Sequence, residues 1–233
     1  MLRSQHWPRG GAIARALHGA GATVALSGTR VEALEGLASE LGENAHITPA
    51  NLSDAESLAA LIGTAEEAMG AVDILINNAG LFLDNPFVGD PGPDWLSVVE
   101  SAHWLTAFRV NTVAPFMMTR ALRVNLKAAD HGTVVMISAM MGSLTNNQSG
   151  GAYCYRSSKA ALNAVTVSLA TDLAVDGTRV VALHPGWLQT DMGGDDAPVD
   201  APTSAKGLRT VMLNIDAKQN GGFFDYAGAS IPW

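Results

Sequence analysis

Short apolar runs that alternate with longer segments of helical periodicity are the feature that most restricts the fold of this 233-residue chain. The clearest runs cover residues 72–76, 133–137 and 178–183 and are rich in valine, isoleucine and leucine. Helical segments of ten or more residues separate such runs, and parallel strands require connections of this length. The alternation therefore predicts an α/β fold, a doubly wound parallel sheet with helices on both faces.

The same periodicity predicts the individual elements. Strands are expected at residues 22–26, 46–50, 72–76, 133–137, 178–183 and 222–226. Helices are expected at 11–20, 31–41, 54–69, 95–126 with an interruption near Asn111, 153–173 and 205–215, and residues 188–204 are expected to form a loop. Because no repeat or linker divides the chain, we expect residues 1–233 to form a single domain.

Charge and composition argue against several classes of protein. The net charge is −8 and only 14 residues are lysine or arginine, which disfavours nucleic acid as a partner because phosphate binding needs clustered cations. No apolar stretch approaches the ~20 residues that span a bilayer, so we expect no membrane partner. Cys154 is the only cysteine, which excludes an intrachain disulfide and makes a cytoplasmic location the simplest expectation.

A tyrosine and a lysine four residues apart carry the clearest chemical signal. Because residues four apart share a helix face, the phenol of Tyr155 and the ammonium of Lys159 are expected to point into one cleft. A nearby cation stabilises tyrosinate and lowers the phenol pKa, which lets the tyrosine exchange a proton with a carbonyl or an alcohol. The alternative is a surface helix on which the two residues occur together by chance.

Further motifs favour the chemical interpretation. They are Asn77-Asn78-Ala79-Gly80 after the run at 72–76, Asn111, and His184-Pro185-Gly186-Trp187 after the run at 178–183. Together with Tyr155-x-x-x-Lys159, they resemble the short-chain dehydrogenase/reductase family in order and approximate spacing. Residues 11–80 are similar to 3-oxoacyl-acyl-carrier-protein reductases, and the chain from about residue 111 onward is similar to C-factor and sniffer-like carbonyl reductases.

The resemblance implies a Rossmann-like fold and three catalytic roles. Tyr155 is expected to act as the acid, Lys159 to lower the tyrosine pKa and hold the cofactor ribose, and Asn111 to hold a water in a proton relay. A plain capping role is the alternative for Asn111. A pocket for a small carbonyl substrate is expected from His184, Trp187, Met192, Met140 and Met141, although each of these also suits ordinary packing.

The family serine that polarises the carbonyl is missing, because its position holds Ala139. The adjacent Ser138 is the nearest catalytic candidate, but neighbouring residues of an extended segment face opposite ways, so its hydroxyl points away unless a bulge turns it. Ser143 and Ser149 in the following loop are other candidate donors. The loss of one such donor typically costs about 10²- to 10³-fold in rate.

Residues at the expected strand ends are assigned to the cofactor. The set is Gly10, Gly11, Thr29, Arg30, Asn51, Leu52, Asn78, Ala79, Gly80, Tyr155, Lys159, Pro185, Gly186 and Thr190. An acidic residue after the second strand would accept the ribose hydroxyls of NAD, and residues 27–30 contain none. NADP(H) is therefore the preferred cofactor, with Arg30 on its 2'-phosphate, and NAD(H) is the alternative; a solvated Arg30 would be the simpler interpretation of that residue.

The beginning of the chain departs from the family pattern. A dinucleotide fold needs an apolar first strand that runs into a glycine-rich turn, so that helix amides meet the pyrophosphate. Residues 1–9 do not form an apolar run, and the spaced glycines are reduced to Gly10 and Gly11. We therefore expect the first strand and the glycine-rich turn to be truncated, and cofactor binding to be weakened.

These observations predict an NADPH-dependent oxidoreductase that transfers hydride between the nicotinamide cofactor and a small carbonyl or alcohol. A catalytically impaired family member that retains a binding role is the first alternative, which Ala139 and the short beginning favour. A 3-oxoacyl-acyl-carrier-protein reductase is the second, and it would need a basic docking patch that we do not identify. The sequence is compatible with a homo-oligomer, and no residues are assigned to a metal.

Overall fold

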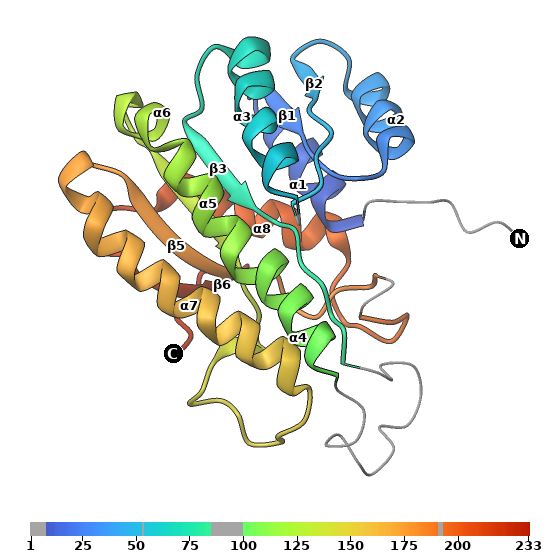
Figure 1. Ribbon diagram of the computed structural model, residues 1–233, viewed down its shortest axis with the longest axis vertical. Coiled ribbons are helices and arrows are strands. Elements are labelled where there is room, and N and C mark those ends of the chain that lie inside the picture. The colour runs from blue at the N-terminus through green and yellow to red at the C-terminus, as the bar shows by residue number, and fades with distance from the viewer. Residues whose placement is uncertain (1–7, 53, 85–99, 191–192) are drawn as a thin grey trace, which may run out of the picture.

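The computed structural model describes residues 8–52, 54–84, 100–190 and 193–233 (Figure 1). All pairs between its named strands are parallel, as predicted. The strands are β1 (Val24–Leu26), β2 (Ala45–Ile47), β3 (Ile74–Asn77), β4 (Thr133–Ile137), β5 (Arg179–His184) and β6 (Phe223–Asp225).

Helices cover both faces of the strands, which confirms the predicted α/β class. Figure 1 shows α3, α5 and α7 in front of the strands and α1 and α8 behind them. The α-helices are α1 (Pro8–His18), α2 (Val31–Leu41), α3 (Ala55–Met69), α4 (Ser101–Phe108), α5 (Ala114–Ala121), α6 (Arg123–Ala128), α7 (Tyr153–Leu173) and α8 (Ala201–Asn214). The predicted ranges of α2, α7 and β4 agree with the structure at both ends, and the other elements are shifted by a few residues.

The sheet differs from the single continuous sheet that we predicted. In the described residues, β1 pairs with β2, and the order β3-β4-β5-β6 forms a separate four-stranded sheet. Helix α1 joins the two, because Ile13 packs against Val135 and Ile137 of the larger sheet while Ala14 packs against Val24 and Leu26 of the smaller one. The predicted truncation of the first strand concerns residues 1–7, which lie outside the described part of the chain.

Alternate residues of the central strands serve opposite faces of the larger sheet. Along β4, Val134 and Met136 belong to the core cluster beneath α5 and α7, whereas Val135 and Ile137 belong to the cluster beneath α1 and α8. All four residues are completely buried. The period of two therefore explains why these strands are apolar throughout their length.

Helix ends follow local capping chemistry, including one that the sequence analysis missed. Asp54 caps α3, since its carboxylate accepts a hydrogen bond from the backbone N–H of Glu56. Helix α8 begins at Ala201 rather than at the predicted Ala205, because Asp200 caps it through the backbone N–H of Thr203. The last four residues of the predicted 188–204 loop are therefore helical. No helix among the described residues is long and apolar enough to cross a membrane.

Candidate active site

The predicted tyrosine and lysine lie together at the beginning of α7, near the carboxyl end of β4. Tyr155 is 6% exposed and Lys159 is 2% exposed. The Lys159 Nζ atom lies 5.8 Å from the centre of the Tyr155 ring and donates a hydrogen bond of 2.8 Å to the carbonyl oxygen of Ile137. The ring of Phe82 packs against the ring of Tyr155, and the two ring centres lie 4.9 Å apart. The predicted shared helix face is confirmed.

Asn111 connects this helix to the loop that follows β3. It is fully buried in a π-helical turn, Arg109–Val113, which is the interruption predicted between α4 and α5. Its amide accepts from the backbone N–H of Leu81 at 2.8 Å and donates to the Leu81 carbonyl at 2.9 Å and to the Ser158 hydroxyl at 2.9 Å. Asn111 thus fixes the loop against α7, and single π-turns of this kind are frequent at functional sites.

Gly80 lies at the point where these groups meet. A Cβ atom at Gly80 would lie 3.4 Å from Lys159 Nζ, 3.7 Å from Asn111 Oδ1 and 3.9 Å from a terminal nitrogen of Arg9. The absence of a side chain at Gly80 leaves that position free beside two cationic groups and an amide. A ligand phosphate or ribose hydroxyl would find donors and an acceptor there, so the residues present suit a dinucleotide cofactor.

Burial dominates the electrostatics of the site. Burial, and to a smaller extent the nearby charge of Arg9, lowers the pKa of Lys159 to about 7. Burial also raises the pKa of Tyr155, an effect that Arg9 partly offsets. Desolvation of Tyr155 thus outweighs the attraction of the nearby cation, and the expected effect of Lys159 on the tyrosine pKa stays a prediction.

Asp84 holds the first turn of α7, a role that the sequence analysis missed. Its carboxylate is 2% exposed and accepts hydrogen bonds from the backbone N–H groups of Cys154 at 2.8 Å and Tyr155 at 2.7 Å. Ala152 precedes the helix in a left-handed conformation and supplies no side-chain cap. The distant Asp84 therefore takes the place of a local capping residue, and a carboxylate at a helix N-terminus also suits the helix dipole.

The contacts of Ser138 argue against its predicted catalytic role. Ser138 is 1% exposed, and its hydroxyl donates to Asn163 Oδ1 at 2.6 Å, so it is occupied inside the protein. The inward direction of this hydroxyl agrees with the alternation of an extended segment, and the catalytic role of Ser138 stays a prediction. Of the other candidates, Ser143 is buried and donates to the Pro232 carbonyl, and exposed Ser149 accepts from Arg156.

The remaining cofactor candidates occupy strand ends and helix beginnings. Thr29 and Arg30 are exposed between β1 and α2, and Asn51 is exposed beyond β2, whereas Leu52 packs against the core beneath α3. Gly10 and Gly11 lie in the first turn of α1.

The cofactor candidates after β5 make local contacts. The Pro185 carbonyl accepts a hydrogen bond from the Ser204 hydroxyl, and the Thr190 hydroxyl accepts one from the backbone N–H of Gly193. Gly186 has a φ of 87°. Asn78 and Ala79 are half-buried immediately after β3.

The predicted substrate-pocket residues differ in exposure. Trp187 is 53% exposed and Met140 is 38% exposed, so both present apolar surface to solvent. Burial lowers the pKa of His184 to about 4, and its buried Nδ1 atom has no hydrogen-bond partner among the described residues. Met192 lies outside the described residues. Cys154 is buried, which raises its thiol pKa to about 11 and makes it a poor nucleophile.

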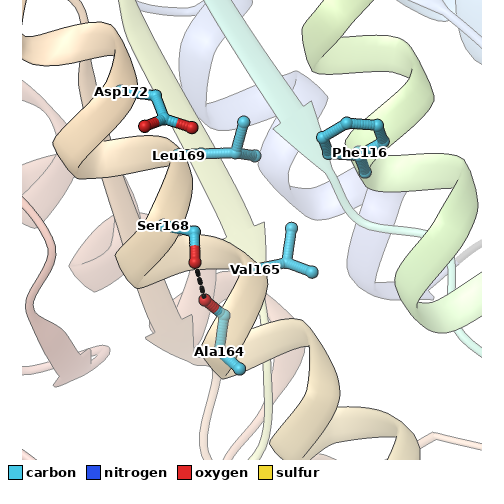
Figure 2. A pocket seen from close by; sticks show the side chains of 6 residues that line it. All are labelled: Phe116, Ala164, Val165, Ser168, Leu169 and Asp172. Carbon is cyan, nitrogen blue, oxygen red and sulfur yellow. Dashed lines mark hydrogen bonds between the residues drawn. The ribbon is translucent and has the colours of Figure 1, made fainter.

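An open apolar groove lies farther along α7, away from these groups. Figure 2 shows its lining, which consists of Phe116 from α5 and of Ala164, Val165, Ser168, Leu169 and Asp172 from α7. Asp172 is its only ionisable residue, so the groove lacks groups that could transfer a proton to a carbonyl. In the parts of the chain that the structure describes, no three histidine, cysteine, aspartate or glutamate side chains are grouped to hold a metal ion.

Replacement of Asp84 should loosen the first turn of α7. In Asp84→Asn, an amide NH₂ faces one of the two backbone N–H donors, and an unsatisfied buried donor costs about 1 to 3 kcal/mol. We expect a lower free energy of unfolding in urea and faster amide hydrogen exchange at Cys154 and Tyr155. The matched control is Asp54→Asn, which alters an exposed cap on α3 and should change exchange near Glu56 only. Unchanged exchange at Tyr155 in Asp84→Asn would contradict the capping role.

Lys159 should make stability depend on pH. Its pKa of about 7 in the folded protein lies below the ordinary value of 10.5, so the unfolded chain binds the proton more tightly between these values. Stability rises with pH wherever the unfolded state binds more protons. The free energy of unfolding of the wild type should therefore increase relative to Lys159→Met from about pH 7 to about pH 9.5. Lys206 is exposed, so the free energy of unfolding of Lys206→Met should depend on pH as that of the wild type does. The same pH dependence in Lys159→Met would refute the burial effect.

Comparisons with known proteins agree with this geometry. A family model described as short chain dehydrogenase matches residues 10–199. C-signal of Myxococcus xanthus is 42% identical over 164 residues, which are 70% of this chain and 94% of that protein. The carbonyl reductase Sniffer of D. melanogaster has a TM-score of 0.87 and 31% identity over 97% of this chain and 95% of that chain. The NADPH-bound carbonyl reductase from chicken fatty liver has a TM-score of 0.80 and 29% identity over 90% of this chain and 87% of that chain.

Both groups predicted from the sequence occur among the relatives, since 3-oxoacyl-[acyl-carrier-protein] reductases also match, with 32% identity for the protein of Rickettsia bellii. That match covers 78% of this chain, as against 97% for Sniffer. The motif-based assignment of the family is confirmed. The chain belongs to the short-chain dehydrogenase/reductase family, whose members are NAD(P)-dependent oxidoreductases that act on carbonyl and alcohol groups.

Proposed function

We propose that this protein is an NADPH-dependent carbonyl reductase that converts a small carbonyl compound to the alcohol, and the reverse. One observation carries the proposal: Tyr155 and Lys159 are buried on one face of α7, beside the free position at Gly80. Sniffer and the chicken enzyme are named as carbonyl reductases, and both are similar to this chain over nine tenths of its length or more.

Tyr155 is the proton donor in the proposed reduction. Burial raises the pKa of Tyr155, so the phenol keeps its proton near neutral pH, which is the form that reduction requires. When bound, the nicotinamide cofactor supplies the hydride. The phenol proton passes to the carbonyl oxygen, and the resulting tyrosinate is stabilised by the positive charges of Lys159 and Arg9.

Lys159 and Asn111 are proposed to restore the proton. Lys159 Nζ lies 5.8 Å from the centre of the tyrosine ring, and its hydrogen bond to the Ile137 carbonyl fixes the direction of the ammonium group. The side chain of Asn111 holds the loop and α7 together. We therefore propose that Asn111 takes part in the relay by holding a water at the π-helical turn. Lys159 is also proposed to hold a ribose hydroxyl at the Gly80 position.

The preference for NADPH rests on the residues after β1. Thr29 and Arg30 are exposed at that strand end, and residues 27–30 contain no carboxylate that would accept ribose hydroxyls and repel a phosphate. Arg30 precedes α2 and its side chain makes no capping bond, so its guanidinium is not needed for the helix. We assign it to the 2'-phosphate of NADPH.

A weakly active member of the family is the second candidate, and Ala139 favours it. The carbonyl-polarising serine is absent, and the hydroxyls of Ser138 and Ser143 are engaged in bonds inside the protein. The loss of one donor leaves an enzyme slower by about 10²- to 10³-fold and does not abolish proton transfer. Turnover of small aldehydes with NADPH, measured against the Tyr155→Phe variant, separates a slow enzyme from an inactive one.

Tyr155→Phe should abolish carbonyl reduction and leave NADPH affinity nearly unchanged. Phenylalanine keeps the packing against Phe82, so only the proton path is lost. The rate is followed as NADPH oxidation, and affinity as NADPH fluorescence. Tyr153→Phe, which alters an exposed tyrosine two residues away, serves as the control. Turnover retained in Tyr155→Phe would remove the assigned acid.

Arg30→Ala should weaken NADPH binding far more than NADH binding. A hydrogen bond to a charged group contributes about 1.5 to 3 kcal/mol, which corresponds to roughly tenfold or more in affinity. Fluorescence titration with both cofactors measures the difference. Arg120→Ala removes an exposed arginine from α5 and should leave both affinities unchanged. Equal losses for NADPH and NADH in Arg30→Ala would show that Arg30 acts only through general charge.

A further inference from the structure

Arg156, the residue after Tyr155 on α7, bonds a segment outside its own helix. Its guanidinium donates hydrogen bonds at 2.8 Å, 3.1 Å, 3.1 Å and 3.5 Å to the Ser149 hydroxyl and to the carbonyl oxygens of Gly150, Gly151 and Met141, in that order. All of these acceptors belong to residues 138–152, which connect β4 to α7 and are called the β4–α7 segment below. One side chain thus contacts both the early and the late part of this segment.

Neither charge pairing nor helix stability accounts for an arginine at this position. Among the described residues, Arg156 forms no ion pair with a carboxylate. A cation near the beginning of a helix is unfavourable with respect to the helix dipole. A planar guanidinium with five N–H donors is, however, suited to bond several oxygen atoms at once. The contacts with the β4–α7 segment are therefore the structural role of Arg156.

The late part of the segment has a backbone conformation that these bonds support. Gly150, Gly151 and Ala152 have φ angles of 64°, 66° and 45°, so three consecutive residues are left-handed. Alanine rarely adopts this conformation, because its Cβ atom crowds the backbone. Such residues persist only where surrounding contacts hold them, and they cluster at functional sites. The bonds from Arg156 to the two glycine carbonyls are contacts of this kind.

The rest of the segment is anchored at two further places. In its early part, the Asn163 side chain of α7 donates to the Gly142 carbonyl at 3.0 Å. In its middle, the Ser143 hydroxyl donates to the Pro232 carbonyl at 2.6 Å. Helix α7 therefore fixes the segment near both of its ends, and a residue close to position 233 fixes it between them.

The segment lies where a substrate of the proposed reaction would bind. Open α/β sheets bind ligands outside the carboxyl ends of their strands, and Figure 1 shows the segment at the beginning of α7, beyond that edge of the sheet. It starts beside the Ile137 carbonyl that accepts the bond from Lys159. It also presents apolar side chains to solvent, since Met140 is 38% exposed and Leu144 is 75% exposed. Apolar side chains predominate in the lining of sites for organic ligands.

We propose that Arg156 is a positioning residue for the carbonyl substrate. By holding the β4–α7 segment, it keeps Met140 and Leu144 in place as an apolar wall of the substrate site, on the side of the helix turn that carries Tyr155. The substrates that benefit from this wall are carbonyl compounds with an apolar group. This inference rests on the proposed function and extends it to a residue outside the predicted site.

The test uses two aldehydes with the same reacting group, propanal and 3-phenylpropanal. In Arg156→Ala, the KM for 3-phenylpropanal should rise by roughly tenfold, because the contacts of one apolar group contribute about this factor. The KM for propanal and the affinity for NADPH should stay nearly unchanged. Arg156→Lys should recover only part of the loss, since an ammonium lacks the planar set of donors. Ser157 bonds carbonyls of its own helix, so Ser157→Ala should behave like the wild type.

A general disturbance of α7 would change both aldehydes alike. An unchanged ratio of the two KM values in Arg156→Ala would therefore overturn the inference. Backbone hydrogen exchange in residues 140–151 should be faster in Arg156→Ala than in Ser157→Ala, and equal exchange in the two variants would also overturn it.

Calorimetric binding of 3-phenylpropan-1-ol requires no turnover and separates this inference from the proposed function. If the wild type reduces neither aldehyde but binds the alcohol more tightly than Arg156→Ala does, the apolar wall stands and the proposed function fails. If the wild type reduces both aldehydes and the two proteins bind the alcohol equally, the proposed function stands and the role of Arg156 fails.

Discussion

The buried ammonium of Lys159 is the group on which the arrangement of the site depends. It is a charge held at 2% exposure, and its one hydrogen bond to a described residue goes to the carbonyl of Ile137 at the end of β4. This contact requires α7 to lie close to the segment that follows β4. Gly142 permits that approach, because a Cβ atom there would lie 2.9 Å from Lys159 Cβ and 3.0 Å from its carbonyl carbon.

The need to keep α7 close to the end of β4 explains why residues of other segments hold this helix in place. Its first turn is capped by Asp84 from the loop after β3, and its second turn is bonded by Asn111 and Thr112 of the π-helical turn. Thr112 donates to the Ser158 carbonyl at 2.8 Å, next to the lysine. Two separate segments thus fix the helix, so that the positions of Tyr155 and Lys159 do not rest on helix propensity. Preorganisation of this kind keeps a proton donor in place before substrate arrives.

Local patterns were sufficient to predict the scaffold. The ranges of β4 and α7 follow from apolar runs and helical spacing, and the interruption near Asn111 follows from an asparagine inside a helical pattern. What the sequence did not reveal depends on distant partners. Asp84 bonds residues 70 and 71 positions away, and Arg9 bonds Asn78 at a separation of 69. The sequence held a weak signal that Arg9 has a distant partner, because a cation in the first turn of a helix is unfavourable with respect to the helix dipole.

The inward direction of the Ser138 hydroxyl was easier to predict than the start of α8. Asp200 and Pro202 are local signals for a helix beginning, and they were outweighed by the loop-like composition of residues 188–204. For Ser138 the period of an extended segment already indicated the wrong direction, and the bond to Asn163 follows it. Ser138 became a candidate because it is next to Ala139, which occupies the position of the family serine, and not because of the physical pattern.

The missing serine and the burial of Lys159 have a joint consequence for the proposed reaction. Without the serine hydroxyl, the carbonyl oxygen depends on the phenol of Tyr155 for its developing charge, so acidity of that phenol matters more. Burial raises the pKa of Tyr155 and lowers that of Lys159 to about 7, so Lys159 is only partly protonated near neutral pH. A negative charge bound beside Lys159 would favour its protonated form, because an opposite charge within a few ångströms stabilises a cation. Under the proposed function, the binding of an anionic cofactor and the transfer of a proton from Tyr155 are therefore linked through the charge of Lys159.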